Sequence, residues 1–283
     1  MIKDVLVHLD GSAQDEERLR YAEAVAAISQ AHVTGLLTNP LPDMPMIAPM
    51  DSGAAAAEAL VSLEEEARQT GGRIQRKLAE RCSRLGVPNE IRRVDALFGQ
   101  LPRRAASEAR WADLFVASRP YDGNGAMDWS SLFEAVLFES GRGILVVPPG
   151  HRPPGSLRRV LVCWRDTREA ARAVAEASPL IAKATRTVVL AIDPEPRKRD
   201  GVGSEPAADV AKHLTRLGTS VEVNLVESQN HETHEVILDQ ARRLSADLIV
   251  MGGYGHSRAR EWMIGGATRS MLTVSESPVL IAH

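Results

Sequence analysis

Short apolar runs alternate with amphipathic segments along the whole chain. In the second half the apolar runs lie near 158–164, 187–193, 221–227, 246–251 and 278–282, and helix-like segments lie between them near 168–183, 206–217, 231–244 and 266–275. The apolar runs are nearly continuous in Val, Ile and Leu, which is typical of parallel strands covered by helices on both faces. We therefore expect an α/β fold, with doubly wound sheets and right-handed crossovers.

The same pattern occurs twice. Segments 5–12 and 160–167 resemble each other at an offset of 155 residues, as do 32–37 and 187–192, whereas 112–117 and 143–148 match 246–251 and 277–282 at an offset of 134. The first half thus carries about 21 extra residues between its second and third strands, where a Pro- and Met-rich stretch precedes a helical run near 54–85.

The repeat predicts two tandem domains. We expect them at residues 1–149 and 156–283, joined by a proline-rich linker, each with its own five-stranded parallel sheet and with no sheet continuous between them. The insert contains three methionines, Met44, Met46 and Met50. They are consistent either with an apolar lid or with a loop that packs on the first domain.

Composition narrows the class of protein. The net charge is −3 with Lys and Arg spread along the chain, so a nucleic-acid partner is not expected. Cys82 and Cys163 fall one in each half and outside any C-x-x-C pair, which favours a reducing compartment over a disulfide scaffold or zinc site. The N-terminus has no signal-peptide layout and no apolar run has membrane-spanning length. We expect a cytoplasmic protein without a membrane partner.

A glycine-rich segment follows the fourth strand of the second half. Gly252 and Gly255 are followed, after nine intervening residues, by Gly265 and Gly266, which open the next helix. Glycines let the backbone approach a ligand, and the free N–H groups of a helix N-terminus favour an anion. Ligands of such sheets bind beyond the carboxyl ends of the strands. The segment predicts a phosphate site, although turns and close packing would also use glycines here.

This segment resembles the nucleotide-binding motif of the universal stress protein family. The opening run VLVHLDGS and the later run ADLIVMGGYGHSR are also similar to that family, and the resemblance covers essentially the whole chain, as in tandem members. It implies ATP or a related adenine nucleotide as ligand, with Mg²⁺ as a candidate companion ion. It also implies that the final strands, 143–147 and 278–282, lie at the contact between the halves as an intramolecular pseudo-dimer; a homodimer and a protein partner stay open.

The nucleotide site is expected in the second half. Its candidate residues are Met251, Gly252, Tyr254, Gly255, His256, Ser257, Arg258, Gly265, Gly266, Ala267, Thr268, Arg165 and Ile192. Two departures from the family pattern matter: Gly266 stands where Ser or Thr is usual, and Arg165 aligns with the aspartate that the first half keeps as Asp10. In the first half the four glycines become Ser118, Tyr121, Ser131 and Leu132, and Thr268 becomes Glu134, whose charge would repel phosphate.

The function expected is therefore nucleotide binding in a stress-response or regulatory protein without fast chemistry, and no catalytic residue is nominated. The alternatives are an enzyme that slowly cleaves ATP phosphates and a ligand-free interaction module. A pair of histidines, His231 and His234, comes close to the H-E-x-x-H metal signature but has the wrong spacing, and Glu232 and Glu235 suit a polar first helical turn instead.

Overall fold

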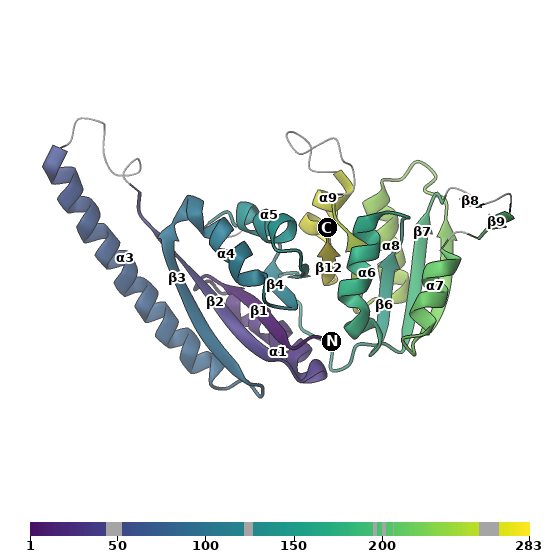
Figure 1. The fold of residues 1–283 in the computed structure, drawn as a ribbon, viewed down its shortest axis with the longest axis horizontal. Coiled ribbons are helices and arrows are strands. Elements are labelled where there is room, and N and C mark those ends of the chain that lie inside the picture. The colour runs from purple at the N-terminus through teal and green to yellow at the C-terminus, as the bar shows by residue number, and fades with distance from the viewer. Residues whose placement is uncertain (44–52, 122–126, 195–196, 200–201, 206, 255–265) are drawn as a thin grey trace.

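The computed structural model describes residues 1–43, 53–121, 127–194, 197–199, 202–205, 207–254 and 266–283 (Figure 1). The first half runs β1 (Asp4–Leu9), α1 (Asp15–Ser29), β2 (His32–Leu41), α3 (Gly53–Cys82), β3 (Asn89–Leu97), α4 (Leu101–Ala109), β4 (Leu114–Ser118), α5 (Ser130–Glu139) and β5 (Gly143–Val147), with a 3-10 turn, η1 (Phe98–Gln100), before α4. The second half runs β6 (Arg159–Cys163), α6 (Arg168–Ile181), β7 (Arg186–Ile192), α7 (Ala208–Thr215), β10 (Ser220–Val226), α8 (Thr233–Leu244), β11 (Leu248–Gly252), α9 (Gly266–Val274) and β12 (Val279–Ala282).

The two halves have the same topology. Their strand orders are β3-β2-β1-β4-β5 and β10-β7-β6-β11-β12, and neighbouring strands within each half are parallel. The α/β fold and the predicted strands and helices of the second half are confirmed, with ends shifted by a few residues. A small antiparallel hairpin, β8 (Arg197–Arg199) with β9 (Val202–Ser204), was not foreseen.

The expectation of two separate sheets is wrong. Strand β12 pairs antiparallel with β5, so that Leu280 lies opposite Leu145, and the two parallel sheets become one sheet of ten strands. The predicted contact between the final strands is confirmed. Every residue of β5 and β12 is buried, and a buried edge strand needs partners for its N–H and C=O groups. Each half supplies those partners to the other.

The hydrophobic core is also shared between the halves. Residues on one face of the sheet pack under α1, α6 and α7, and those on the other face pack under α4, α5, α8 and α9. Leu145 and Leu280 belong to the first cluster, whereas Ile144 and Ile281 belong to the second. Both layers therefore continue across the junction, as the alternation of side chains along a strand requires.

The insertion lies where the offsets placed it, between β2 and β3. It ends in α3, a helix of 30 residues, where the second half has the 8 residues of α7. The C-terminal part of α3 is anchored by buried Leu78 and Cys82, whereas Val61 and Leu63 near its other end are exposed. The methionines Met44, Met46 and Met50 lie outside the described residues. No helix in the described part of the chain is long and apolar enough to cross a membrane.

Candidate functional site

The carboxyl ends of three strands meet at one edge of the second half. Cys163, the last residue of β6, pairs with Leu190 of β7 on one side and with Met251 of β11 on the other. The strand order reverses between β6 and β11, which makes this edge the topological switch point of the half. The predicted residues Arg165, Ile192 and Gly252 are therefore brought to the same edge, with Arg165 exposed to solvent.

Gly252 packs against the start of α6. A Cβ on Gly252 would lie 2.6 Å from the backbone nitrogen of Ala170 and 2.7 Å from the carbonyl carbon of Glu169. The first turn of α6 is held by Thr167, whose hydroxyl accepts a hydrogen bond from the Ala170 N–H at 3.3 Å. Gly252 thus has the packing role that the sequence analysis offered as the alternative to phosphate binding. Gly253 has a similar role, because a Cβ there would lie 2.7 Å from Cδ1 of Ile281.

Gly266 has a different environment. It is the first residue of α9 and it is exposed, and an added Cβ would come within 4 Å of none of the described residues, which exclude 255–265. Ala267 is half-buried and Thr268 is buried. The Thr268 hydroxyl accepts a hydrogen bond from the backbone N–H of Tyr254 at 3.4 Å, so it ties α9 to the end of β11. At the start of α9, none of the described residues covers Gly266, and Thr268 anchors the helix.

The other predicted residues divide into two groups. Met251 is buried in the core under α8 and α9, so its side chain packs inside the domain. The residues Gly255, His256, Ser257, Arg258 and Gly265 lie outside the described residues, and their predicted contacts with phosphate stay predictions.

Tyr254 connects this edge to the first half. Its hydroxyl lies 3.0 Å from that of Tyr121, which in turn donates to Oε1 of Glu134 at 2.7 Å. Since Tyr121 gives its proton to the carboxylate, Tyr254 is the donor to Tyr121. Burial raises the pKa of Tyr254 to about 12, and burial together with the Tyr254 hydrogen bond raises that of Tyr121, so both stay protonated at neutral pH.

The first-half residues of this contact occupy positions equivalent to the phosphate segment of the second half. Tyr121 occupies the position equivalent to Gly255, and Glu134 the position equivalent to Thr268. Sequence reasoning interpreted Glu134 only as a charge that repels phosphate and did not foresee its partner. Further contacts surround the pair: the Arg269 guanidinium lies 4.9 Å above the Tyr121 ring, and the Phe138 ring lies 5.3 Å from that of Tyr254.

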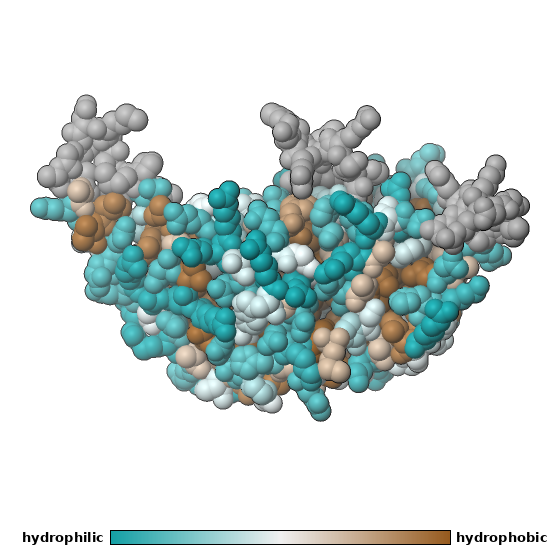
Figure 2. All heavy atoms as spheres, viewed as in Figure 1, coloured by the Kyte–Doolittle hydropathy of each residue, from teal (hydrophilic) through white to brown (hydrophobic). Residues whose placement is uncertain are grey.

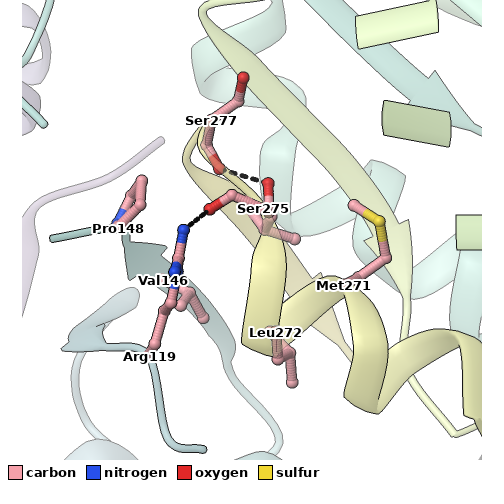
Figure 3. Close-up of a pocket in the computed structure, with 8 residues that line it drawn as sticks. Arg119, Val146, Pro148, Met271, Leu272, Ser275 and Ser277 are labelled. Carbon is pink, nitrogen blue, oxygen red and sulfur yellow. Dashed lines mark hydrogen bonds between the residues drawn. The ribbon is translucent and has the colours of Figure 1, made fainter. Parts of the chain in front are cut away.

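Arg119 holds the other end of α9 (Figure 3). It follows β4, and its guanidinium donates to the carbonyl oxygen of Thr273 at 3.0 Å and to that of Ser275. The Ser275 hydroxyl donates to the carbonyl of Ser277 at 2.8 Å. A cation at a helix C-terminus meets unpaired carbonyls and a favourable dipole. The helix that opens at Gly266 is therefore clamped by the first half at its far end.

In the first half the equivalent strand end is filled by a buried ion cluster. Nη2 of Arg18, a side chain only 1% exposed, lies 2.6 Å from Oδ1 of Asp10 and 2.5 Å from Oδ1 of Asp15. The indole N–H of Trp129 donates to Oδ2 of Asp10 at 2.7 Å. Burial, the largest single influence, would raise the pKa of Asp10, but the Arg18 charge, His8 and the hydrogen bonds from Ser12 together outweigh it and hold that pKa far below its usual range. Asp10 is thus engaged inside the protein.

The histidine segment behaves as a helix cap. Glu232 is the N-cap of α8 and forms a capping box with Glu235, whose Oε2 accepts from the Glu232 backbone N–H at 3.1 Å. Nδ1 of His231 lies 3.7 Å from the same carboxylate. Among the described residues, no group of three His, Cys, Asp or Glu side chains could hold a metal ion.

Comparison with protein families finds a match in the second half of the chain. Residues 156–283 match the model of the Universal stress protein family. The chain carries a universal stress protein domain at these residues. Comparison with curated proteins found no match.

Solved structures extend the likeness to the whole chain. A universal stress protein from Archaeoglobus fulgidus DSM 4304 is 17% identical with a TM-score of 0.68, over 99% of this chain and 97% of that one. A functionally unknown protein from Pseudomonas aeruginosa PAO1 is 16% identical with a TM-score of 0.56, over 99% and 92%. At these identities the likeness shows the fold, and it shows that the fold of both halves occurs together in one chain.

Proposed function

We propose that this chain is an adenine-nucleotide-binding regulatory protein of the stress response, with ATP bound in the second half. The observation that carries the proposal is the start of α9: it lies at the carboxyl edge of the sheet, at the switch point, and no described residue lies close to Gly266 at this helix N-terminus. The resemblance of the glycine segment to the nucleotide motif of the family supports an adenine nucleotide as the anion.

The same geometry supports a regulatory role. A phosphate at the start of α9 would lie on a helix whose other end is held by Arg119 and whose neighbour Tyr254 is hydrogen-bonded to Tyr121. Occupancy of the site would then alter contacts that join residues 1–149 to residues 156–283, which we take as the two domains. No general base or metal pair is nominated for cleavage of ATP, and slow hydrolysis is the second candidate function.

The proposal can be tested at Gly266 with two substitutions that differ by one hydroxyl. Gly266→Ser restores the residue type usual in the family and places Oγ at a helix N-terminus, where an added Cβ meets none of the described residues within 4 Å. We expect ATP to bind roughly tenfold more tightly, because a hydrogen bond to a charged oxygen is worth about 1.5–3 kcal/mol.

Gly266→Ala is the matched control, since it adds the Cβ without the hydroxyl. Its affinity should stay near that of the wild type in titration calorimetry. Equal affinities for the serine and alanine variants would remove α9 from the nucleotide site. Mass spectrometry of small molecules released from the purified protein would show independently whether an adenine nucleotide is bound.

A further inference from the structure

The ten-stranded sheet ends in the second half at β10. This strand pairs with β7 on one side, and on the other side it has no partner strand in the described part of the chain, since β8 and β9 form a sheet of their own. The N–H of Ser220 and the C=O of Val226 bond to residues that flank β7. Because successive residues of a strand direct these groups to opposite sides, those of Val221, Val223 and Leu225 point away from β7. We call these three residues the free edge.

The side chains of the free edge are apolar. Val223 is 41% exposed and Leu225 is 47% exposed, whereas Val221 is half-buried and packs against the core. Val223 lies opposite Val189, a core residue of the face under α6 and α7, so the free edge belongs to that face. Figure 2 shows hydrophobic surface among polar groups on this side of the second half. An edge strand with exposed apolar side chains is a template for another strand.

The opposite end of the sheet is protected. The pairing registers of the two halves place Ile91 of β3 at the position of Val223. Two residues on, Arg93 takes the position of Leu225. The Arg93 guanidinium donates to a backbone carbonyl of α3 at 3.4 Å and lies 3.0 Å from Oδ2 of Asp95. Charged side chains and a 30-residue helix thus cover that edge, whereas the 8 residues of α7 leave most of the free edge exposed.

The sequence of β10 is complementary to itself. When two copies of the strand run antiparallel with Val223 opposite Val223, Val221 of one copy lies opposite Leu225 of the other. The backbone groups of all these residues point to the partner, so each pair exchanges two N–H···O bonds. On the other face Glu222 lies opposite Asn224, whose amide is a donor for the carboxylate.

Other registers lose this match. Moving the centre to Glu222 would place two carboxylates directly opposite each other, and moving it to Asn224 would place Val221 opposite Glu227. Like charges in opposite positions destabilise a strand pair. A two-fold axis normal to the sheet and centred on Val223 instead joins the apolar residues of both copies on one face.

We propose that two copies of this chain associate through β10, antiparallel and centred on Val223, so that the sheet continues from one copy into the other. The fold already uses such a junction inside the chain, where β5 and β12 pair as antiparallel strands. The association needs no nucleotide, so its failure and the failure of the proposed function are separate results.

Sedimentation equilibrium of the full-length protein measures this association. The weight-average mass should rise with concentration from that of one chain toward that of two. Val223→Lys should weaken the association roughly tenfold or more, because two ammonium groups would then face each other at the centre of the pair. Val61→Lys is the matched control: this valine of α3 is 69% exposed and lies outside β10, so the association should be unchanged.

Cysteine cross-linking tests the register. In Val223→Cys the two new thiols lie on residues whose Cα atoms are about 5.5 Å apart, within the range that a disulfide spans. In Leu225→Cys the new thiols are offset by four residues, or roughly 13 Å along the strands. Oxidation with copper phenanthroline should give a covalent dimer of the first variant and not of the second. The wild type, with Cys82 and Cys163, gives the background.

Three outcomes would contradict the β10 junction. One is a mass that stays at that of a single chain at every concentration, and another is an equal effect of Val223→Lys and Val61→Lys. The last is cross-linking of Leu225→Cys as fast as that of Val223→Cys, which would rule out the register. Circular dichroism of each variant checks that its fold is retained.

Discussion

Gly252 and Gly266 flank the candidate phosphate site and have opposite surroundings. At Gly252 a Cβ would collide with backbone atoms of α6, whereas at Gly266 it would come within 4 Å of no residue that the structure describes. We expect Gly252→Ala to lower the free energy of unfolding by about 1–3 kcal/mol, because backbone must shift to admit the methyl group. Gly266→Ala should stay within about 0.5 kcal/mol of the wild type. Urea unfolding of the two variants measures this; equal losses would contradict the packing assigned to α6.

His8 belongs to the buried cluster of the first half. Nδ1 lies 3.1 Å from Nη1 of Arg18, which can only donate, so Nδ1 is the acceptor and the Nε2–H group donates to Thr38. A protonated imidazole would place an N–H group against the guanidinium. Burial, with the Arg18 charge as the next cause, lowers the pKa of His8 to about 3.

This lowered pKa predicts a pH dependence of stability. The unfolded chain binds a proton at His8 near pH 6.5 and the folded chain does not, so the stabilising effect is present above pH 6.5 and is lost as pH falls toward 3. The comparison is with His8→Gln, which keeps one acceptor and one donor but does not titrate. The free energy of unfolding of the wild type, measured relative to that of His8→Gln, should fall by up to about 1.4 kcal/mol per pH unit below 6.5. A difference in unfolding free energy between the two proteins that stays constant from pH 7 to pH 4 would contradict the lowered pKa of His8.

At the scale of elements, different hydrogen bonds hold the two ends of α9. Thr268 ties its start to Tyr254, and Arg119 donates to the carbonyls at its end. We expect Arg119→Gln to lower the free energy of unfolding by about 1.5–3 kcal/mol, the range for hydrogen bonds from a charged group. Amide hydrogen exchange should accelerate in α9. Arg103→Gln on the exposed side of α4 is the control, and equal exchange in both variants would show that the clamp has no effect.

Sequence reasoning succeeded where one segment carries its own signal. The strands of the second half are runs of Val, Ile and Leu, and the offsets of 155 and 134 placed the insertion between β2 and β3. It failed where two distant segments meet. The family resemblance predicted contact between 143–147 and 278–282, but nothing in either segment shows that they pair into one sheet. Nothing near Arg18 in the sequence shows that Asp10 and Asp15 will surround it in the core.

The same distinction applies to the candidate site. The glycine spacing located the carboxyl edge of the second half, but it could not separate Gly252, which packs on α6, from Gly266, which has no described residue packed against it. Tyr121 and Glu134 were visible as replacements for Gly255 and Thr268. Their bond to Tyr254 depends on how the halves meet, which the sequence of either half does not contain.

At the scale of the whole molecule the two halves have the same topology, but different side chains occupy their equivalent strand ends. One sheet and one pair of core layers run through both. In the first half the strand end is closed by Arg18 and Trp129, and the lost phosphate segment contributes Tyr121 to the contact between halves. In the second half no described residue lies within 4 Å of a Cβ added at Gly266, the start of α9. We therefore propose nucleotide in only one half of a nearly symmetric chain.

The number and place of bound nucleotides test this assignment most directly. Titration calorimetry with ATP should give one site per chain. Gly266→Asp should abolish binding, because the carboxylate suits a helix N-terminus but repels phosphate. Asp10→Asn should leave the affinity unchanged, since Asp10 is engaged by Arg18 and Trp129. Loss of binding in Asp10→Asn with full binding in Gly266→Asp would place the nucleotide in the first half and contradict the account.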